Sequence, residues 1–456
     1  MQVLDFITLL IIMAAFFTLI NVKYLKLPST IGLMILALGL SVFIVFGEFV
    51  FSLLRELTTD LMTKYKFSDV LFRVMLSFLL FAGALEMDLK KLGEEKWPIL
   101  ILATVGVLIS TFIVGTAVYY VLALPFINIP IDYIHCLLFG ALISPTDPIA
   151  VLAMVKKTPV SKNLESQIAG ESLFNDGIGV VVFLSILAIA ENGAENFQPV
   201  DVVKLFGIEV LGGLALGALF GFVGLYLLKI IDNAHTEIEV LVTLSMVLGG
   251  ASVADFLHVS SPLAMVVMGL WVGREGREGE DAAGEYVYKF WHLMDEAMNA
   301  ILFILIGLQI IRIAEELQNN IVFLAAIPLA IIIVLLSRFV GVGAPIVVMR
   351  TMRKFPRFTV RILTWSGLRG GISVALALSL YEETHSGFIL PLNDVNLITA
   401  MTYGVVLFSI VVQGLTMKKF FDMYARANAN NPDVEQVPIE GAPAQDTSEG
   451  EQQPAV

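Results

Sequence analysis

The chain contains few charged residues and only one cysteine. Asp, Glu, Lys and Arg make up 15% of its 456 residues, whereas 57% are hydrophobic and the mean hydropathy is +0.85. This composition excludes an ordinary soluble protein and indicates a chain that crosses a membrane several times. Cys136 has no second cysteine to pair with. An internal disulfide is therefore excluded, and we expect Cys136 to be buried as a small apolar residue.

Two further signals are missing. No glycine-rich phosphate loop stands between a strand and a helix, and the chain leaves no room for a large soluble regulatory domain. The N-terminus has Asp5 but no basic stretch before its first apolar run. We therefore expect residues 1–20 to form a retained first helix and not a cleaved signal.

Apolar segments dominate what the chain does contain. Most of them approach or exceed the ~18 residues that mark a spanning helix, so we predict an all-α membrane protein with about thirteen transmembrane helices. The ninth segment is short and is expected to be broken or tilted. The expected spans are 3–20, 28–46, 68–87, 98–124, 133–155, 167–190, 203–231, 237–257, 261–273, 292–312, 320–349, 361–381 and 394–416.

Basic residues are scarce in one of the two sets of alternate loops. One set holds twenty Lys and Arg residues, whereas the opposite set holds only Arg55, Lys64, Lys66, Lys204 and Arg312. Basic loop residues stay in the cytoplasm. The distribution therefore predicts a multi-pass protein of the cell membrane with its N-terminus outside and its C-terminus in the cytoplasm.

The composition changes after Tyr424. Residues 427–456 hold six acidic residues and no basic one, with little apolar content. Such a segment cannot bury enough apolar surface to fold a core. We therefore divide the chain into a transmembrane domain, 1–424, and a disordered acidic cytoplasmic tail, 425–456.

Two of the expected spans carry helix-weakening residues at their centres. The fifth span, 133–155, contains Pro145 and Pro148, and the twelfth, 361–381, contains three glycines around Arg369. These two spans cross the membrane in opposite directions. Inverted repeats whose discontinuous helices meet at the bilayer midplane have this arrangement in secondary transporters. The alternative is two ordinary kinks, which membrane helices tolerate.

Oxygen-bearing side chains stand at the first interruption and in the next span. A charged side chain at the membrane centre costs roughly 2.5 to 3.5 kcal/mol, so such groups normally face a cavity. Unwound carbonyls, the Thr146 hydroxyl and the Asp147 carboxylate would supply the oxygen ligands that a hard cation such as Na+ prefers. Ser172 and Asp176 are four residues apart on one helix face and would add a hydroxyl and a second carboxylate.

A carboxyl group in a partly dry cavity holds a proton closer to neutral pH than it does in water. A carboxylate that binds either a proton or a sodium ion, but not both, is a sufficient basis for ion exchange. This chemistry needs no covalent catalysis and no cofactor. The alternative interpretation of Asp176 is a buried, hydrogen-bonded residue that packs two helices.

Three basic residues, Arg73, Arg338 and Arg369, fall inside expected spans, and each requires a partner or a polar cavity. If Arg338 reaches Glu171, the two form a buried ion pair, and breaking one side of such a pair usually costs ~3 to 5 kcal/mol. Glu171 is therefore assigned to structure and not to transport. Arg369 is expected to neutralise the carbonyl ends of the broken helices, or else to repel cations from one route.

Other polar residues allow only less specific interpretations. Asp255 and His258 lie near the outer end of the eighth expected span, where a solvated helix end is favoured over a role in a pore. Glu86 could donate an oxygen to the cavity or lie at the membrane interface. His135 and His235 are at loop edges, and ordinary exposed histidines are favoured over pH sensors.

Gly213, Gly217 and Gly221 recur at every fourth residue. A stripe of this kind on a membrane helix permits a second helix to pack closely against it. The stripe does not indicate whether the second helix belongs to the same protomer or to another.

Four motifs follow one another along the chain. They are Ser-Pro-Thr-Asp-Pro at 144–148, Gly-Glu-Ser-Leu-Phe-Asn-Asp-Gly at 170–177, Ser-Arg-Phe at 337–339 and Gly-Leu-Arg-Gly-Gly-Ile-Ser at 367–373. Together they resemble the cation:proton antiporter-1 family, the sodium/proton antiporters of the NhaP/NHE type. The resemblance spans nearly the whole membrane part. It implies thirteen helices, arranged as a dimerisation domain and a six-helix core domain, in a homodimer that works by an elevator-like motion.

The resemblance also implies residue roles in the exchange of Na+ or Li+ for H+. By position, Asp176 is similar to the family's ion-binding aspartate. Asp147 and Thr146 are similar to its partners on the unwound helix, and Ser172 to a coordinating hydroxyl. The resemblance implies no cofactor beyond the transported ions.

Three other positions refine the resemblance. Glu171 and Arg338 are similar to the family's stabilising pair. Asn175, which precedes the binding aspartate, is similar to the Asn-Asp branch and implies electroneutral exchange of one cation for one proton. Glu86 matches no motif, and the short tail resembles prokaryotic members.

Three alternatives to sodium/proton exchange are retained. A K+/H+ antiporter would use the same oxygen ligands and differ in cavity size. A passive cation channel would carry flux that follows the membrane potential. An intramembrane aspartyl protease would use Asp147 and Asp176 as a dyad, but the Tyr-Asp and Gly-x-Gly-Asp patterns of such enzymes are missing. We expect a transporter and not an enzyme, with monovalent cations, protons and membrane lipid as its partners and no nucleic acid.

Overall fold

A computed structural model describes residues 3–46, 71–125, 127–155, 158, 160–192, 199–231, 236–278, 282–309, 323–385 and 390–428. Within these residues the regular structure is helical, apart from one isolated β-bridge. Eight of the described helices are long and apolar enough to cross a membrane, and five shorter apolar helices accompany them. The expected all-α architecture with about thirteen spans is therefore confirmed.

The helices of the N-terminal half include the first of the two expected interruptions. They are α1 (Val3–Ile20), α2 (Ser29–Phe46), α5 (Leu76–Glu86), α6 (Leu89–Glu94), α7 (Lys96–Ile101), α8 (Val107–Leu122), α9 (Tyr133–Ile143), α10 (Ile149–Val155) and α11 (Lys162–Asn192). Three π-helical turns extend them, namely η1 (Asn21–Leu25), η2 (Leu71–Met75) and η3 (Leu102–Gly106). Arg73 lies in η2, but its side chain is outside the described part of the structure.

The helices of the C-terminal half include the second interruption. They are α12 (Pro199–Ile230), α13 (Thr236–Leu257), α14 (Ser261–Glu278), α15 (Ala282–Leu308), α17 (Phe323–Met349), α18 (Thr359–Trp365), α19 (Gly371–His385), α20 (Leu392–Phe408), the π-helical turn η5 (Ser409–Gln413) and α21 (Gly414–Asn428). The short ninth span is not broken, because α14 continues without interruption to Glu278.

Helix α21 extends the ordered part of the chain beyond the expected tail boundary at residue 425. Its apolar face buries Met417, Phe421 and Tyr424 at helical spacing. Asn428 ends the helix with a buried amide that accepts from the Arg357 backbone N–H and donates to the Arg357 carbonyl, both at 3.1 Å. The rest of the expected tail, 429–456, and His235 lie outside the described residues.

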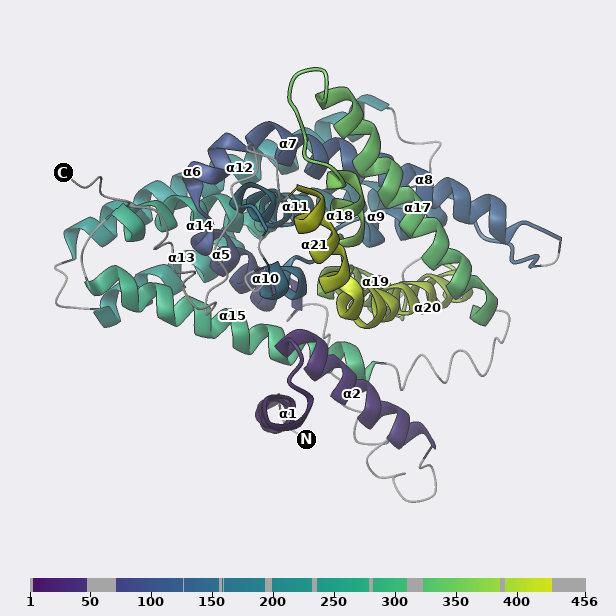
Figure 1. Ribbon diagram of the computed structural model, residues 1–456, viewed down its shortest axis with the longest axis horizontal. Helices are drawn as coiled ribbons and strands as arrows, with labels where there is room; N and C mark the ends of the chain where they lie inside the picture. Colours follow the sequence, from purple (N-terminus) through teal and green to yellow (C-terminus); the bar gives the residue numbers. More distant parts are fainter. Residues whose placement is uncertain are drawn as a thin grey trace, which may run out of the picture.

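Two sets of helices pack around different partners (Figure 1). In one set, α9 lies against α8 and α11, α17 against α8 and α20, and α19 against α20. In the other set, α14 lies against α12, α13 and α5. Helix α15, along the lower side of Figure 1, contacts α2 and α5 and also reaches α19. It therefore connects the two sets.

The glycine stripe of α12 packs within the protomer. A Cβ atom at Gly213 would meet Ser260, one at Gly217 would meet Ala264, and one at Gly221 would meet Trp271. These three residues lie on α14 or directly before it, and α14 packs along the length of α12. The small residues therefore serve the close approach of two helices of the same chain.

Both expected helix interruptions are present, and they cross each other. Helix α9 ends at Ile143 and α10 begins at Ile149, while α18 ends at Trp365 and α19 begins at Gly371. Pro145 and Pro148 have no backbone N–H to continue a helix. The two extended segments meet in an antiparallel β-bridge, in which the Asp147 N–H donates to the Leu368 carbonyl at 2.8 Å. The inverted pair of discontinuous helices predicted from proline and glycine is therefore confirmed.

Candidate ion-binding site

The crossing is held by Arg369 of the α18–α19 segment. Its guanidinium is buried, and Nη1 donates to the carbonyls of Ser144 at 2.5 Å and Pro145 at 3.0 Å. These carbonyls follow the C-terminus of α9, where backbone acceptors lack helical partners and the helix dipole is negative. The Arg369 N–H in turn donates to the Ser409 hydroxyl at 2.8 Å. The side chain thus lies where the sequence analysis expects a cation to neutralise a broken helix.

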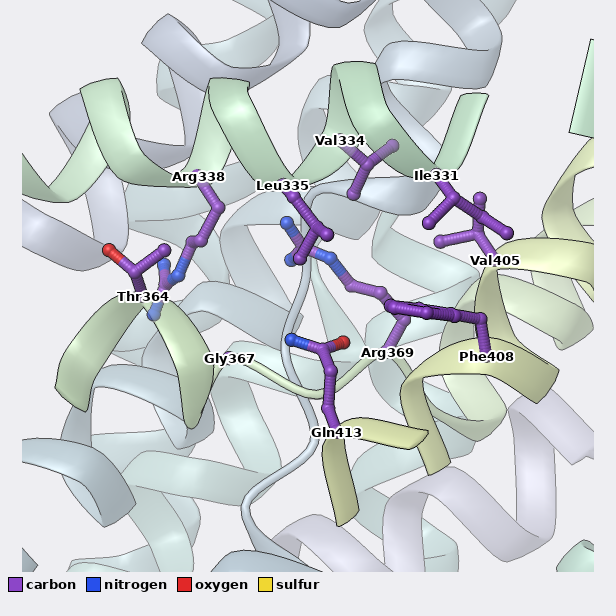
Figure 2. A pocket seen from close by; sticks show the side chains of 10 residues that line it. All are labelled: Ile331, Val334, Leu335, Arg338, Thr364, Gly367, Arg369, Val405, Phe408 and Gln413. Atoms are coloured by element: carbon purple, nitrogen blue, oxygen red, sulfur yellow. The ribbon is translucent and has the colours of Figure 1, made fainter. Parts of the chain in front are cut away.

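A narrow pocket adjoins this arginine. Figure 2 shows Arg338 extending from α17 beside Thr364, whereas Arg369 reaches away from its own backbone toward the other broken helix. The pocket is lined by Ile331, Val334, Leu335, Arg338, Thr364, Gly367, Arg369, Val405, Phe408 and Gln413. This lining contains no carboxylate, so the pocket does not include Asp147 or Asp176.

Asn175 of α11 holds the unwound backbone before α10. Its Oδ1 accepts from the Thr146 N–H at 3.1 Å, and its Nδ2 donates to Thr146 Oγ1 at 2.7 Å. The same Thr146 hydroxyl lies 3.1 Å from Ser172 Oγ. Both polar atoms of the Asn175 amide are therefore committed to the protein. The structure brings Thr146 and Ser172 together, as the sequence analysis expects. Asn175 joins them through a positioning contact with Thr146 that sequence reasoning did not foresee.

Asp147 and Asp176 differ in how many hydrogen bonds their carboxylates accept from the protein. Asp147 Oδ1 accepts from the Ile149 N–H at 2.9 Å, at the start of α10. Asp176 is 7% exposed, and it makes no hydrogen bond or ion pair with any other residue that the structure describes. The two carboxylates are close enough to interact electrostatically. A buried acid without a partner is costly unless a proton or a cation neutralises it.

The close approach at the crossing depends on a glycine. A Cβ atom at Gly370 would collide with the Asp147 side chain. A larger residue at 370 would therefore displace the carboxylate. Among the described residues, no group of three or more His, Cys, Asp or Glu side chains is placed to hold a metal ion. Two carboxylates and two hydroxyls can instead supply oxygens to a weakly held monovalent cation.

Glu171 lies on the same helix as Asp176 but contacts a base. Glu171 Oε1 is 2.5 Å from Arg338 Nη1, with both side chains buried. Arg338 Nη2 also donates to the Leu363 carbonyl at 3.2 Å. The ion pair therefore joins α11, α17 and α18, and Gly367 leaves the space that the guanidinium needs.

The remaining sequence candidates lie apart from the two aspartates. Glu86, at the end of α5, has Oε1 2.6 Å from His292 Nδ1 of α15. Asp255 and His258 are exposed at the end of α13, as a solvated helix end would be. His135 is not an exposed residue. It is 5% exposed at the start of α9, where its Nδ1 lies 2.7 Å from Asp394 Oδ2 of α20.

Sequence reasoning missed two clusters. Glu95 is fully buried and receives both Arg353, as an ion pair, and Gln167, as a hydrogen bond of 2.6 Å. Asp295 and Asn299 of α15 lie inside a span and on one face of the helix. An acid inside an apolar span was a readable signal for the second cluster.

The geometry can now be compared with known proteins. The family model described as "Sodium/hydrogen exchanger, transmembrane" matches residues 11–422. The chain belongs to the sodium/hydrogen exchanger family. This exchanger is 43% identical over 422 residues to the Na+/H+ antiporter NhaP of Pseudomonas aeruginosa, covering 91% of this chain and 95% of that one. It is 30% identical over 420 residues to the Na+/H+ antiporter NhaH of Halobacillus dabanensis, covering 91% and 96%.

A solved structure has the same fold as this exchanger. The sodium proton antiporter MjNhaP1 of Methanocaldococcus jannaschii superposes with a TM-score of 0.71. The alignment covers 92% of this chain and 98% of that one, at 20% sequence identity. The resemblance based on four motifs is therefore confirmed for the family and for the fold.

Proposed function

We propose that this exchanger moves Na+ or Li+ against H+ with a stoichiometry of one to one. The single observation that carries the proposal is Asp176, a buried carboxylate with no protein partner among the described residues, beside Asp147. The two relatives described above are Na+/H+ antiporters, which supports Na+ as the cation. K+/H+ exchange at the same oxygens remains the second candidate.

Competition for one carboxylate provides the coupling. When Asp176 is protonated, the buried site carries less negative charge and attracts a cation less strongly. When the proton leaves, Asp176, Asp147 and the hydroxyls of Thr146 and Ser172 present oxygens to a cation. Asn175 cannot titrate in this range, and its amide is bound to Thr146. One exchangeable charge at the site therefore favours electroneutral turnover.

Access from alternate sides requires one set of helices to move relative to the other. We assign α7 to α11 and α17 to α21, which surround the crossing, to a core subdomain. The set around α14 is assigned to a dimerisation subdomain of a homodimer. One set of alternate loops holds twenty basic residues and the opposite set holds five. This difference supports an outer N-terminus and a cytoplasmic C-terminus in the cell membrane.

Transport by proteoliposomes tests the activity and the ion. The purified protein is reconstituted with an imposed pH gradient, and Na+, Li+ or K+ is added outside. We expect Na+ and Li+ to dissipate the gradient, and clamping the membrane potential with valinomycin and K+ to leave the Na+ rate unchanged. A K+ response equal to that of Na+ favours the second candidate. A rate that follows the imposed potential contradicts electroneutral exchange.

A further inference from the structure

Helix α15 carries three polar side chains on one face in the middle of its span. His292, Asp295 and Asn299 are three and four residues apart, so they lie on one face of the helix. One end of this line meets α5, where His292 contacts Glu86 at 2.6 Å. Polar residues on one face of a membrane helix normally face protein or a polar cavity and not lipid.

The other end of the line points to the crossing of the broken helices. Leu302, one turn after Asn299, lies against Gly371, where a Cβ atom would collide with its side chain. The neighbouring Gly370 lies equally close to Asp147, since a Cβ atom there would collide with the Asp147 side chain. The face of α15 therefore leads from Glu86 to the residues that pack beside Asp147.

Asp295 is between these two ends. It interacts electrostatically with Glu86 and with Asp147, and His292 is the only base among the groups that act on it. The groups facing Asp295 from α5, from the α9–α10 segment and from its own helix are therefore two acids and one histidine. Negative charge therefore predominates around the Asp295 carboxylate, and this favours a cation at that position.

Asn299 gives an independent indication of a ligand. Its side chain is 4% exposed, and neither Oδ1 nor Nδ2 has a hydrogen-bond partner among the described residues. The amide lies beside the Asp295 carboxylate, close enough to interact with it. Leaving a buried polar group unpaired costs about 1 to 3 kcal/mol. An amide oxygen beside a carboxylate is a common donor set for a hard cation.

We propose that Asp295 and Asn299 form a second cation station, which holds a monovalent cation in transit between Glu86 and the Asp147–Asp176 site. The station rests on the proposed function in one respect, because the transported cation is its occupant. It consists of one carboxylate and one amide, so binding is weak and the ion passes on. The ligand of the station is an alkali cation that has lost some or all of its hydration water.

Transport kinetics test the station in the reconstituted protein. We expect Asp295→Asn to raise the KM for Na+ about tenfold while the maximal rate stays within twofold, because the neutral amide no longer attracts the cation. Asn299→Leu is expected to raise KM about threefold, because it removes one neutral oxygen ligand. The double variant Asp295→Asn/Asn299→Asp moves the charge by one turn and should lower KM again toward the wild-type value.

Glu285→Gln is the matched control. It removes the same charge from the same helix, but Glu285 is exposed, and among the described residues its ion-pair partner is the exposed Lys289. Exposed ion pairs contribute little to protein stability, and Glu285 is not part of the station. The KM for Na+ should therefore not change. An unchanged KM in Asp295→Asn overturns the station. A lower maximal rate and a lower melting temperature with unchanged KM also overturn it, because that pattern indicates a packing role.

Direct binding separates the station from the proposed function. In purified Asp176→Asn protein the main site is disabled, and 23Na NMR linewidth should still report a weakly bound Na+. Adding Asp295→Asn should remove that broadening, whether or not the wild-type protein exchanges Na+ for H+. Equal linewidths in the two proteins overturn the station. A wild-type protein that fails to exchange Na+ while this broadening persists overturns the proposed function alone.

Discussion

Helix α11 carries two buried acids, Glu171 and Asp176, in opposite surroundings. Glu171 has the Arg338 guanidinium at 2.5 Å, whereas Asp176 has no hydrogen-bond or ion-pair partner among the described residues. Five residues of one helix therefore separate an acid whose charge the protein neutralises from an acid whose charge it leaves to the solvent or to an ion. The comparison shows that burial alone does not indicate transport. The absence of a protein counter-charge is the informative property.

The largest effect is expected from Asp176→Asn. The amide carries no charge and cannot exchange a proton in this range, so Na+-dependent dissipation of the pH gradient should fall at least about a hundredfold. The folded protein should be no less stable, because an unpaired buried acid has been removed. Thermal unfolding in detergent measures stability alongside transport. Substantial residual exchange would remove Asp176 from the proposed site.

Glu171→Gln should produce the opposite pattern. It leaves Arg338 as an unpaired buried charge and should lower the free energy of unfolding by ~3 to 5 kcal/mol. The double variant Glu171→Leu/Arg338→Met removes both charges and should be more stable than the single variant. Melting temperatures of the three proteins give the result. A stable Glu171→Gln protein without exchange would mean that Glu171 takes part in transport.

Asn175 lies between Glu171 and Asp176 on α11, and variants at this position test how α11 is connected to the unwound segment at Thr146. Asn175→Leu removes both contacts to Thr146 and should reduce exchange about tenfold, since each unpaired buried group costs about 1 to 3 kcal/mol. Asn175→Asp keeps an acceptor for the Thr146 N–H and adds an acid. We expect that variant to fold and its exchange to respond to the membrane potential. A potential-independent rate in Asn175→Asp would separate Asn175 from the charge stoichiometry.

Acidification should weaken cation binding without slowing turnover. Because a proton and Na+ compete for the same carboxylate, lowering the pH on the side of Na+ entry should raise the KM for Na+, by at most about tenfold per pH unit. The maximal rate at saturating Na+ should stay constant. Initial rates over a matrix of pH and Na+ concentration provide the measurement. A pH effect confined to the maximal rate would place the titrating group elsewhere.

The smallest effect is expected at a third acid, Asp394, which has a histidine partner. His135→Gln retains a donor near Asp394 and should lower the free energy of unfolding by no more than about 1 kcal/mol. Exchange should be unchanged, because His135 is at the far end of α9 from Ser144. Chemical denaturation and transport assays together check this expectation. A large loss of exchange would give the His135 end of α9 a part in the cycle.

Local signals were sufficient to predict much of the fold. Proline and glycine act on the backbone where they stand, so the interruptions at 144–148 and 366–370 were predictable. The proximity of Glu171 and Arg338 was also predictable, because each is a charge in an apolar span that requires a partner. The four motifs then identified the family without any knowledge of distances.

Contacts that depend on tertiary packing were not predictable. His135 was interpreted as exposed because nothing in its neighbourhood reveals Asp394, 259 residues further along the chain. Asn175 was interpreted through its missing charge, whereas its contacts with Thr146 require α11 to pack beside the unwound segment. Asp295 was readable as an acid inside an expected span, but its place beside the site was not, because that place depends on the packing of α15 against α5 and α19.

The β-bridge at the crossing restricts how access to the site can change. Separating the two interruptions would break the Asp147–Leu368 bond and both bonds from Arg369 to the carbonyls of Ser144 and Pro145. Bonds of a buried cation to backbone carbonyls each contribute about 1.5 to 3 kcal/mol. A hinge between the broken helices is therefore an expensive gate. The two interruptions are expected to travel as one rigid body, so that water reaches the carboxylates from a new side only when the helices around the crossing slide past it.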